Sequence, residues 1–171
     1  MLLKNSLKVF TSYIMALTVF LVFLPAPLSL SKDNSLFWFL FYCYLMFTLM
    51  TLLIFSDMKK LAEKERKPEY NLKPHPLKGL LMGVIGFVPF IAVELVYPFI
   101  AFQNVLADKI KYLVFNGLLG PLYGFINLGG ESPAAYILAS AAVPVIAMLG
   151  YMAGYWGIDL KALVKKSGGR R

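Results

Sequence analysis

The stretch that decides the architecture of this chain reads YLVFNGLLGPLYGFINLGG, at residues 112–130. It carries no charge, and its length is close to the minimum for a helix crossing a hydrocarbon core about 30 Å thick at about 1.5 Å per residue. Glycine and proline interrupt it more often than a straight membrane helix usually tolerates. These residues are Gly117, Gly120, Pro121, Gly124, Gly129 and Gly130. The pattern predicts a broken segment that is either re-entrant or interfacial, and not a crossing.

The rest of the chain contains four stretches that are long and apolar enough to cross a membrane. They cover residues 9–31, 34–56, 79–102 and 132–158. Of the 171 residues, 59% are hydrophobic, and the 17 basic and nine acidic residues fall in a few clusters between the apolar stretches. This excludes a soluble enzyme, a disordered tail and a nucleic-acid-binding domain. We predict an all-α, polytopic integral membrane protein, a single membrane domain over residues 1–171 with four transmembrane helices.

The distribution of Lys and Arg predicts the topology. If residues 112–130 do not cross, the N-terminus, the loop 57–78 and the basic tail 159–171 share one side and hold 14 of the 17 basic residues. If they do cross, the split becomes nine against eight. Because basic residues near span ends stay in the cytoplasm, we predict a cell-membrane protein (inner or plasma membrane) with both termini cytoplasmic. Residues 112–130 then lie on the outer side.

The usual catalytic residue sets are missing from the sequence. The chain has one cysteine, Cys43, inside an apolar stretch, and one histidine, His75, between two prolines. A zinc site, a disulfide framework, a phosphate-binding Lys loop and a nucleophile elbow all need residues or spacings that do not occur here. We therefore expect no enzyme activity, no metal and no cofactor.

Small residues predict how two of the helices pack. The third and the last apolar stretches carry glycines at the same spacing, which places each set on one helix face. The two sets are Gly79, Gly83 and Gly86, and Gly150, Gly154 and Gly157. Because glycine lets two backbones approach closely in lipid, we predict that these two helices cross tightly near the cytoplasmic side. Pro89 and Pro144 would kink them near mid-membrane.

Glu94 is the one ionisable residue deep inside an apolar stretch. It lies 16 residues beyond Lys78, about 24 Å into the core, where a carboxyl group either binds a proton or cation in a cavity or serves a structural role. Both alternatives stay open. The candidate partners in an outward-facing polar pocket are Asn116, Tyr123, Asn127, Tyr42, Tyr97 and Tyr136.

Two functions from different classes fit this sequence. The first is a non-catalytic accessory or assembly subunit of a larger membrane complex, which would meet a protein partner through its glycine faces or the loop 57–78. That loop is either a solvated helix end or a docking surface. The second is a small oligomeric solute or ion carrier that uses Glu94 and the broken segment 112–130. We expect contact with the lipid bilayer and none with nucleic acid. Whether Glu94 faces a cavity within one chain, lipid or another chain discriminates between the two functions.

Overall fold

The computed structural model of the chain describes residues 2–29, 35–67, 75–100 and 104–157. Four of its helices are long and apolar enough to cross a membrane. They are α1 (Leu2–Phe23), α3 (Ser35–Glu65), α4 (Lys78–Val96) and α7 (Pro133–Tyr155). The described residues form helices and turns without a strand, which confirms the predicted all-helical class with four candidate membrane helices. The predicted turn at Lys32 and Asp33 and the tail 159–171 lie outside the described residues.

The helix boundaries differ from the predicted ones where side chains find partners beyond the apolar run. Helix α1 begins at Leu2 and not at residue 9, because Asn5 is buried in the bundle. Helix α3 continues past residue 56 to Glu65, as expected of a helix end that extends into the loop 57–78, but Glu65 is buried and not solvated. Helix α4 ends at Val96, short of residue 102, because Pro98 cannot donate a backbone hydrogen bond, and the chain continues as a short 3-10 helix, η2 (Tyr97–Phe99). The other predicted ends, Ser31, Phe102 and Ile158, lie outside the described residues.

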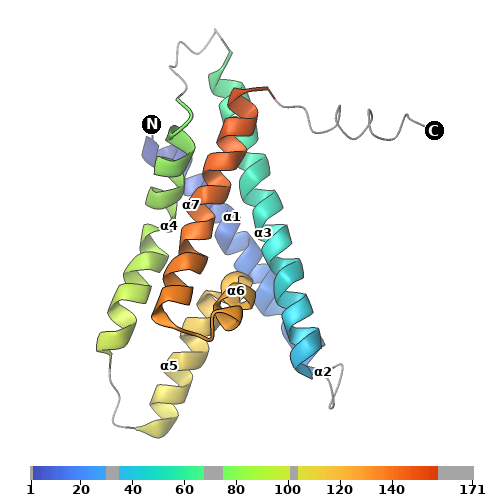
Figure 1. Cartoon of the computed structure of the whole chain (residues 1–171), viewed down its shortest axis with the longest axis vertical. Coiled ribbons are helices and arrows are strands. Elements are labelled where there is room, and N and C mark those ends of the chain that lie inside the picture. The colour runs from blue at the N-terminus through green and yellow to red at the C-terminus, as the bar shows by residue number, and fades with distance from the viewer. Residues whose placement is uncertain (1, 30–34, 68–74, 101–103, 158–171) are drawn as a thin grey trace, which may run out of the picture.

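The four long helices form a bundle in which α7 packs between α3 and α4, and α1 packs against the same two helices (Figure 1). We call one end of the bundle the Glu65 end; the start of α1, the end of α3, the start of α4 and the end of α7 meet there. The opposite end, where α4 stops and α7 starts, is the Glu131 end. The four long helices therefore alternate in direction along the chain, as four consecutive crossings require.

The glycine faces of α4 and α7 both pack tightly, but the two faces meet different neighbouring helices. A Cβ on Gly83 would lie 2.6 Å from the Cα of Pro144, so the glycine face of α4 does meet α7. A Cβ on Gly86 would instead meet α1, 2.7 Å from the carbonyl oxygen of Ser6. The glycines of α7 face α3, where a Cβ on Gly150 would lie 2.8 Å from the carbonyl oxygen of Phe55.

The predicted tight packing of α4 against α7 is present at Gly79 and Gly83, but the two glycine sets do not face each other. Spacing alone places residues on one face of a helix, and it leaves open which neighbour that face meets. Gly79 follows Gly83 in meeting α7, whereas Gly154 lies against Lys59 and Ala62 of α3. The pattern identified helices that approach closely, and α7 uses its glycines for a different partner from the predicted one.

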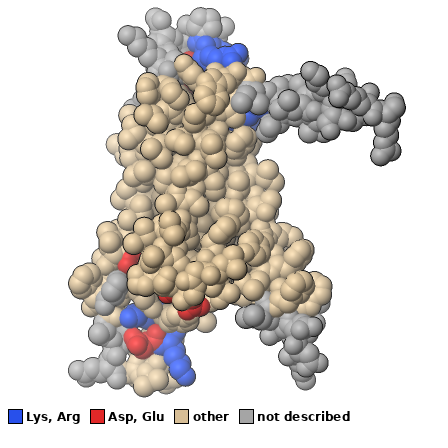
Figure 2. Space-filling model, in the orientation of Figure 1, with Lys and Arg blue, Asp and Glu red and all other residues tan. Residues whose placement is uncertain are grey.

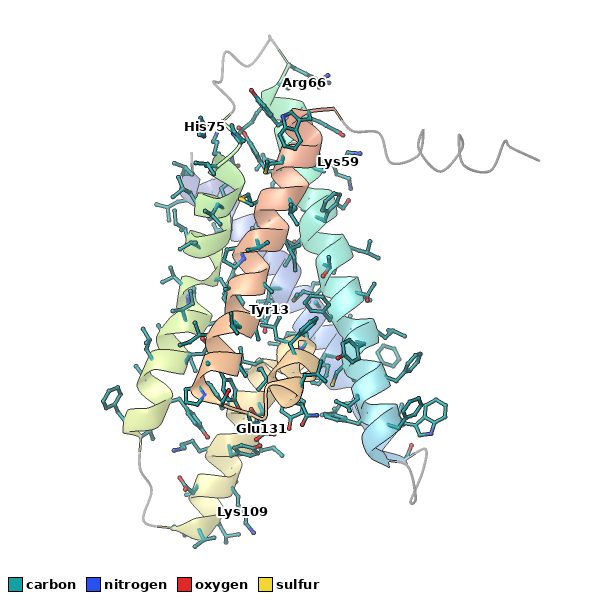
Figure 3. All side chains as sticks on the ribbon, viewed as in Figure 1. Tyr13, Lys59, Arg66, His75, Lys109 and Glu131 are labelled. Atoms are coloured by element: carbon teal, nitrogen blue, oxygen red, sulfur yellow. The ribbon has the colours of Figure 1, made fainter. Side chains whose placement is uncertain are left out.

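The broken segment folds as α5 (Val105–Leu118), a 3-10 turn η3 (Gly120–Leu122) and α6 (Tyr123–Leu128). The side chain of Asn104 caps α5 by accepting a hydrogen bond from the Leu106 amide at 3.0 Å. The turn is packed inside the bundle, where Leu122 is fully buried and the ring of Phe20 fills the space beside Gly120. The phenol of Tyr13 in α1 donates a hydrogen bond to the Leu118 carbonyl at 3.0 Å. Tyr13 lies near the middle of the bundle (Figure 3).

Charged side chains gather at the two ends of the molecule. On the face in Figure 2, a broad band without Lys, Arg, Asp or Glu separates charged groups at the two ends. Such a band matches the hydrocarbon region of a bilayer, which disfavours charge. The fold thus has the surface of a multi-pass membrane protein.

Candidate functional site

A long groove runs between α4 and α7 and has a volume of about 1010 Å³. It extends from Leu80, near the start of α4, to Phe99, beyond its end. Several of its lining side chains are also strongly exposed, among them Leu95 and Ile137. Because these side chains lie on the flanks of apolar helices, the groove opens sideways, toward the region that lipid would occupy.

Glu94 lines this groove from α4. The hydroxyl of Ser140 in α7 donates a hydrogen bond to its Oε1 atom. Among the described residues, no donor reaches its other oxygen, Oε2. The sequence left open whether Glu94 faces a cavity, lipid or another chain, and the structure places it in a groove within its own chain that is open on the side that lipid would occupy. A carboxyl group with a free oxygen in an apolar groove can accept a proton or a cationic ligand.

Aromatic rings form the wall of the groove near the Glu131 end. Tyr97 stacks on Phe115 with ring centroids 3.9 Å apart, and Phe115 in turn contacts the ring of Tyr136 at 5.3 Å. The phenol of Tyr136 donates a hydrogen bond to Oδ1 of Asn116 at 2.9 Å. The other end of that amide, Nδ2, is buried without a partner among the described residues. This cluster joins η2, α5 and α7, and its rings separate the groove from a second one.

Glu131 also lines the groove, at its mouth. The hydroxyls of Tyr112 and Tyr123 each donate a hydrogen bond to one of its carboxyl oxygens, both at 2.6 Å. These two bonds lower the pKa of Glu131 below its usual value, so that it is ionised at neutral pH. The hydrogen bond to Glu131 is also the main reason that the pKa of Tyr112 is raised. Glu131 adopts a left-handed backbone with φ of 54°, which is uncommon for a residue with a side chain.

The structure brings some of the predicted site residues together and leaves others apart. Glu94, Tyr97 and Tyr136 line the groove directly. Asn116 and Tyr123 contact it through their hydrogen bonds to Tyr136 and Glu131.

Two predicted members lie elsewhere. The phenol of Tyr42 donates to the Phe20 carbonyl at 2.6 Å, in a separate cluster between α1 and α3. Asn127, in α6, is half-buried and is not among the described residues that line the groove. The predicted single tyrosine-rich pocket is therefore corrected to a smaller set. Tyr42 was assigned from its approximate depth, which does not determine the direction in which a side chain points.

Three residues of the site were not predicted from the sequence. Ser140 sits in a run of small residues and carries no spacing signal of its own, and Tyr112 is one of ten tyrosines in the chain with no motif that singles it out. Glu131 could have been found, because Ser132 and Pro133 after it mark a helix start. Ser132 does cap α7, accepting from the Ala135 amide at 3.2 Å. Glu131 directly precedes this helix start, and so it lies where the groove beside α7 begins.

A second polar cluster, at the Glu65 end, was also not predicted. Glu65 is only 2% exposed. Its carboxylate forms a salt bridge with Lys78 at 2.5 Å and accepts hydrogen bonds from Tyr151 at 2.7 Å and Asn5 at 3.2 Å. Each of the four long helices contributes one member. Full satisfaction of both oxygens makes this cluster a structural junction, in contrast to Glu94.

No group of three or more metal-ligating side chains occurs within the described part of the chain. His75, which is exposed, accepts a hydrogen bond at Nδ1 from the Leu77 amide at 3.3 Å just before α4. Cys43 is buried between α1 and α3. No family model matches this chain, and no curated protein or solved structure is significantly similar to it. Any function must therefore be argued from the site itself.

Proposed function

We propose that this protein is a small solute carrier of the cell membrane that binds its solute in the α4–α7 groove, with Glu94 as the polar anchor. The observation that carries the proposal is a carboxyl group with a free oxygen that lines a large apolar groove within one chain. Glu94 is half-buried, and a carboxylate in such apolar surroundings is stabilised by a cationic or hydrogen-bonding partner. A bound solute would provide that partner.

The proposal includes a topology in which the Glu65 end is cytoplasmic and residues 112–130 form a re-entrant hairpin from the outside. The bias of basic residues supports the orientation. The hydrogen bond from Tyr13 to Leu118 supports the depth, because Tyr13 is 11 residues, or about 16 Å, from the start of α1. Irregular backbone at such depth needs shelter by protein, and the buried turn at residues 120–122 has it.

The carrier would act as an oligomer. At the Glu65 end, the tight contacts of Gly79 with α7 and of Gly150 with α3 and the junction at Glu65 close the bundle. A solute bound in the groove of a single chain therefore has no path onward through that chain. A second copy facing the groove would supply the missing wall of a pathway.

An accessory subunit is the second candidate, and one observation favours it. A second apolar groove of about 590 Å³ lies between the end of α4 and α5. Helix α5 exposes large apolar side chains there and beyond it, such as Ile110 and Leu113. A transmembrane helix of a partner protein could cover this face. On this alternative, the function of the chain is assembly and not transport.

Photo-crosslinking in cells separates these candidates. The photoreactive residue p-benzoylphenylalanine would replace Ile137, which lines the groove, or Leu138, which is its matched control. Both residues are strongly exposed, at 67% and 72%, but only Ile137 is a groove residue. We expect a defined adduct of small mass at Ile137 that is absent at Leu138, as read by intact mass spectrometry.

Two other outcomes contradict the carrier proposal. An adduct that joins Ile137 to a different protein, and not to a second copy of this chain, would assign the groove to a partner subunit. Equal lipid adducts at both positions would show that the groove is ordinary lipid-facing surface.

A further inference from the structure

The charge of the α4–α7 groove is opposite to that of the chain as a whole. The chain has a formal net charge of +8. The charged side chains that line the groove are nevertheless both acidic, Glu94 and Glu131, and among the described residues no Lys or Arg joins them. A groove with this charge in an apolar setting disfavours anions and favours cations, because the low local dielectric strengthens both effects.

Lys111, which lies beside the aromatic wall, is held outside the groove. Lys111 lies over the ring of Tyr97, with Nζ 4.6 Å from the ring centroid, and lines the second groove. Its ammonium group also donates to the Ile100 carbonyl at 2.5 Å and approaches Asp108 at 3.4 Å. The stacked rings of Tyr97 and Phe115 line both grooves. Lys111 is thus partnered on its own side and does not neutralise Glu94.

The remaining walls fit a bulky organic cation better than an inorganic one. Most of the lining is aliphatic, and Tyr112, Phe115 and Tyr136 add rings near the two carboxylates. Aromatic faces attract organic ammonium groups, whereas a metal ion needs several oxygen or nitrogen ligands, and the described residues contain no such group. The volume of about 1010 Å³ is at the upper end of the range for drug-sized ligands.

The two carboxylates differ in what they can still accept. Glu131 is already held by two tyrosine hydroxyls, whereas Glu94 has one hydroxyl partner and one free oxygen. An incoming cation gains most from Glu94. Glu131, at the mouth, would attract the cation toward the groove without binding it directly.

We infer that the solute of this groove is a lipophilic organic cation, an amine or quaternary onium compound, which enters sideways from the bilayer and pairs with Glu94. This inference rests on the proposed function and names its substrate class. Neither an anion nor an uncharged lipid tail would offer a counter-charge to the free oxygen of Glu94.

Two probes of nearly the same shape and opposite charge test the inference. Tetraphenylphosphonium and tetraphenylborate would each be dialysed against the purified wild-type protein in zwitterionic nanodiscs, with empty nanodiscs subtracted. We expect saturable binding of the phosphonium and none of the borate. Glu94→Gln should weaken phosphonium binding at least tenfold, and Glu131→Gln by a few fold. Glu63→Gln, an exposed carboxylate at the other end, serves as the control and should bind like wild type.

Saturable borate binding that equals or exceeds phosphonium binding in the wild-type protein would overturn the inference, and this comparison does not depend on a variant that folds. Unchanged phosphonium binding in a folded Glu94→Gln variant would do so as well. Failure of the substrate class remains distinct from failure of the carrier proposal. A small adduct at Ile137 without phosphonium binding rejects only the class, whereas the absence of both rejects the carrier and the class together.

Discussion

The two ends of this bundle use the same chemical group for opposite purposes. At the Glu65 end, a carboxylate is buried, ion-paired and hydrogen-bonded by side chains from three other helices. Toward the Glu131 end, the Glu94 carboxyl group lines a groove with one oxygen unpartnered. The difference teaches that the position of a carboxylate in an apolar chain says little about its role. The number of donors that reach it separates a structural junction from a candidate binding site.

The largest effect is expected from removing the cation at the Glu65 end. Lys78→Ala leaves the buried Glu65 carboxylate without its counter-charge, and breaking a buried pair in this way costs about 3–5 kcal/mol. We expect the free energy of unfolding in detergent to fall by about that amount. Lys59→Ala is the control, because Lys59 pairs with the half-exposed Glu63 at 3.6 Å, and such a pair is worth about 0.5 kcal/mol or less.

Replacing both members of the buried pair sharpens the test. Removal of the charge on both sides takes away the desolvation cost together with the attraction. The double variant Glu65→Leu, Lys78→Leu should therefore recover part of the stability that Lys78→Ala loses, and not all of it, because the buried donors of Tyr151 and Asn5 then lack an acceptor. If Lys78→Ala proves no more harmful than Lys59→Ala, the description of this end as a structural junction is wrong.

The next effect concerns the close packing of α4 against α7. Gly83→Ala would place a Cβ 2.6 Å from the Cα of Pro144, so α4 and α7 would have to separate. We expect a loss of about 2 kcal/mol, typical of overpacking. Gly117→Ala is the matched control in α5, where a Cβ would meet nothing within 4 Å, and alanine there should raise stability by up to about 1 kcal/mol. Thermal unfolding of both variants measures the contrast, and equal shifts would contradict the close approach of α4 and α7.

The contrast between the two ends also marks how far the sequence could predict the structure. Length and hydropathy predicted four membrane helices, because a bilayer imposes both requirements on each span directly. The depth of Glu94 in the membrane follows from the same counting and stays a prediction. The junction at Glu65 was not predicted, because its other members lie 13 to 86 residues from Glu65 in the sequence and Glu65 stands in a run of charged residues that is typical of a solvated helix end.

Side-chain direction was the second limit. Tyr42 was assigned to the site by depth alone, and the structure turns it toward Phe20 in another cluster. The glycines of α7 were predicted to face α4 and instead face α3. Depth gave only the level of Tyr42, and periodicity gave only the helix face of the glycines. In both cases the choice of neighbour depended on packing that no local pattern encodes.

The smallest effect is expected at Glu131. Two donors reach its carboxylate, fewer than reach Glu65 and more than reach Glu94. Tyr123→Phe removes one of its two hydroxyl donors, and we expect a loss of about 1 kcal/mol at neutral pH. The folded-state pKa of Glu131 is lowered by its tyrosine donors. Their contribution to stability is therefore present above the unfolded pKa and is lost as the pH falls through the lowered folded value. The wild type and Tyr123→Phe should converge in stability under acid.

Thermal unfolding of both proteins as a function of pH measures this convergence. Tyr155→Phe is a control at the opposite end of the bundle, away from the Glu131 carboxylate. Its difference from wild type should not depend on pH across the same acid range, because it removes no donor from Glu131. A gap between wild type and Tyr123→Phe that stays constant into acid would show that the phenol contributes through packing. Glu131 would then be as free as Glu94, and the groove would have two open carboxylates instead of one.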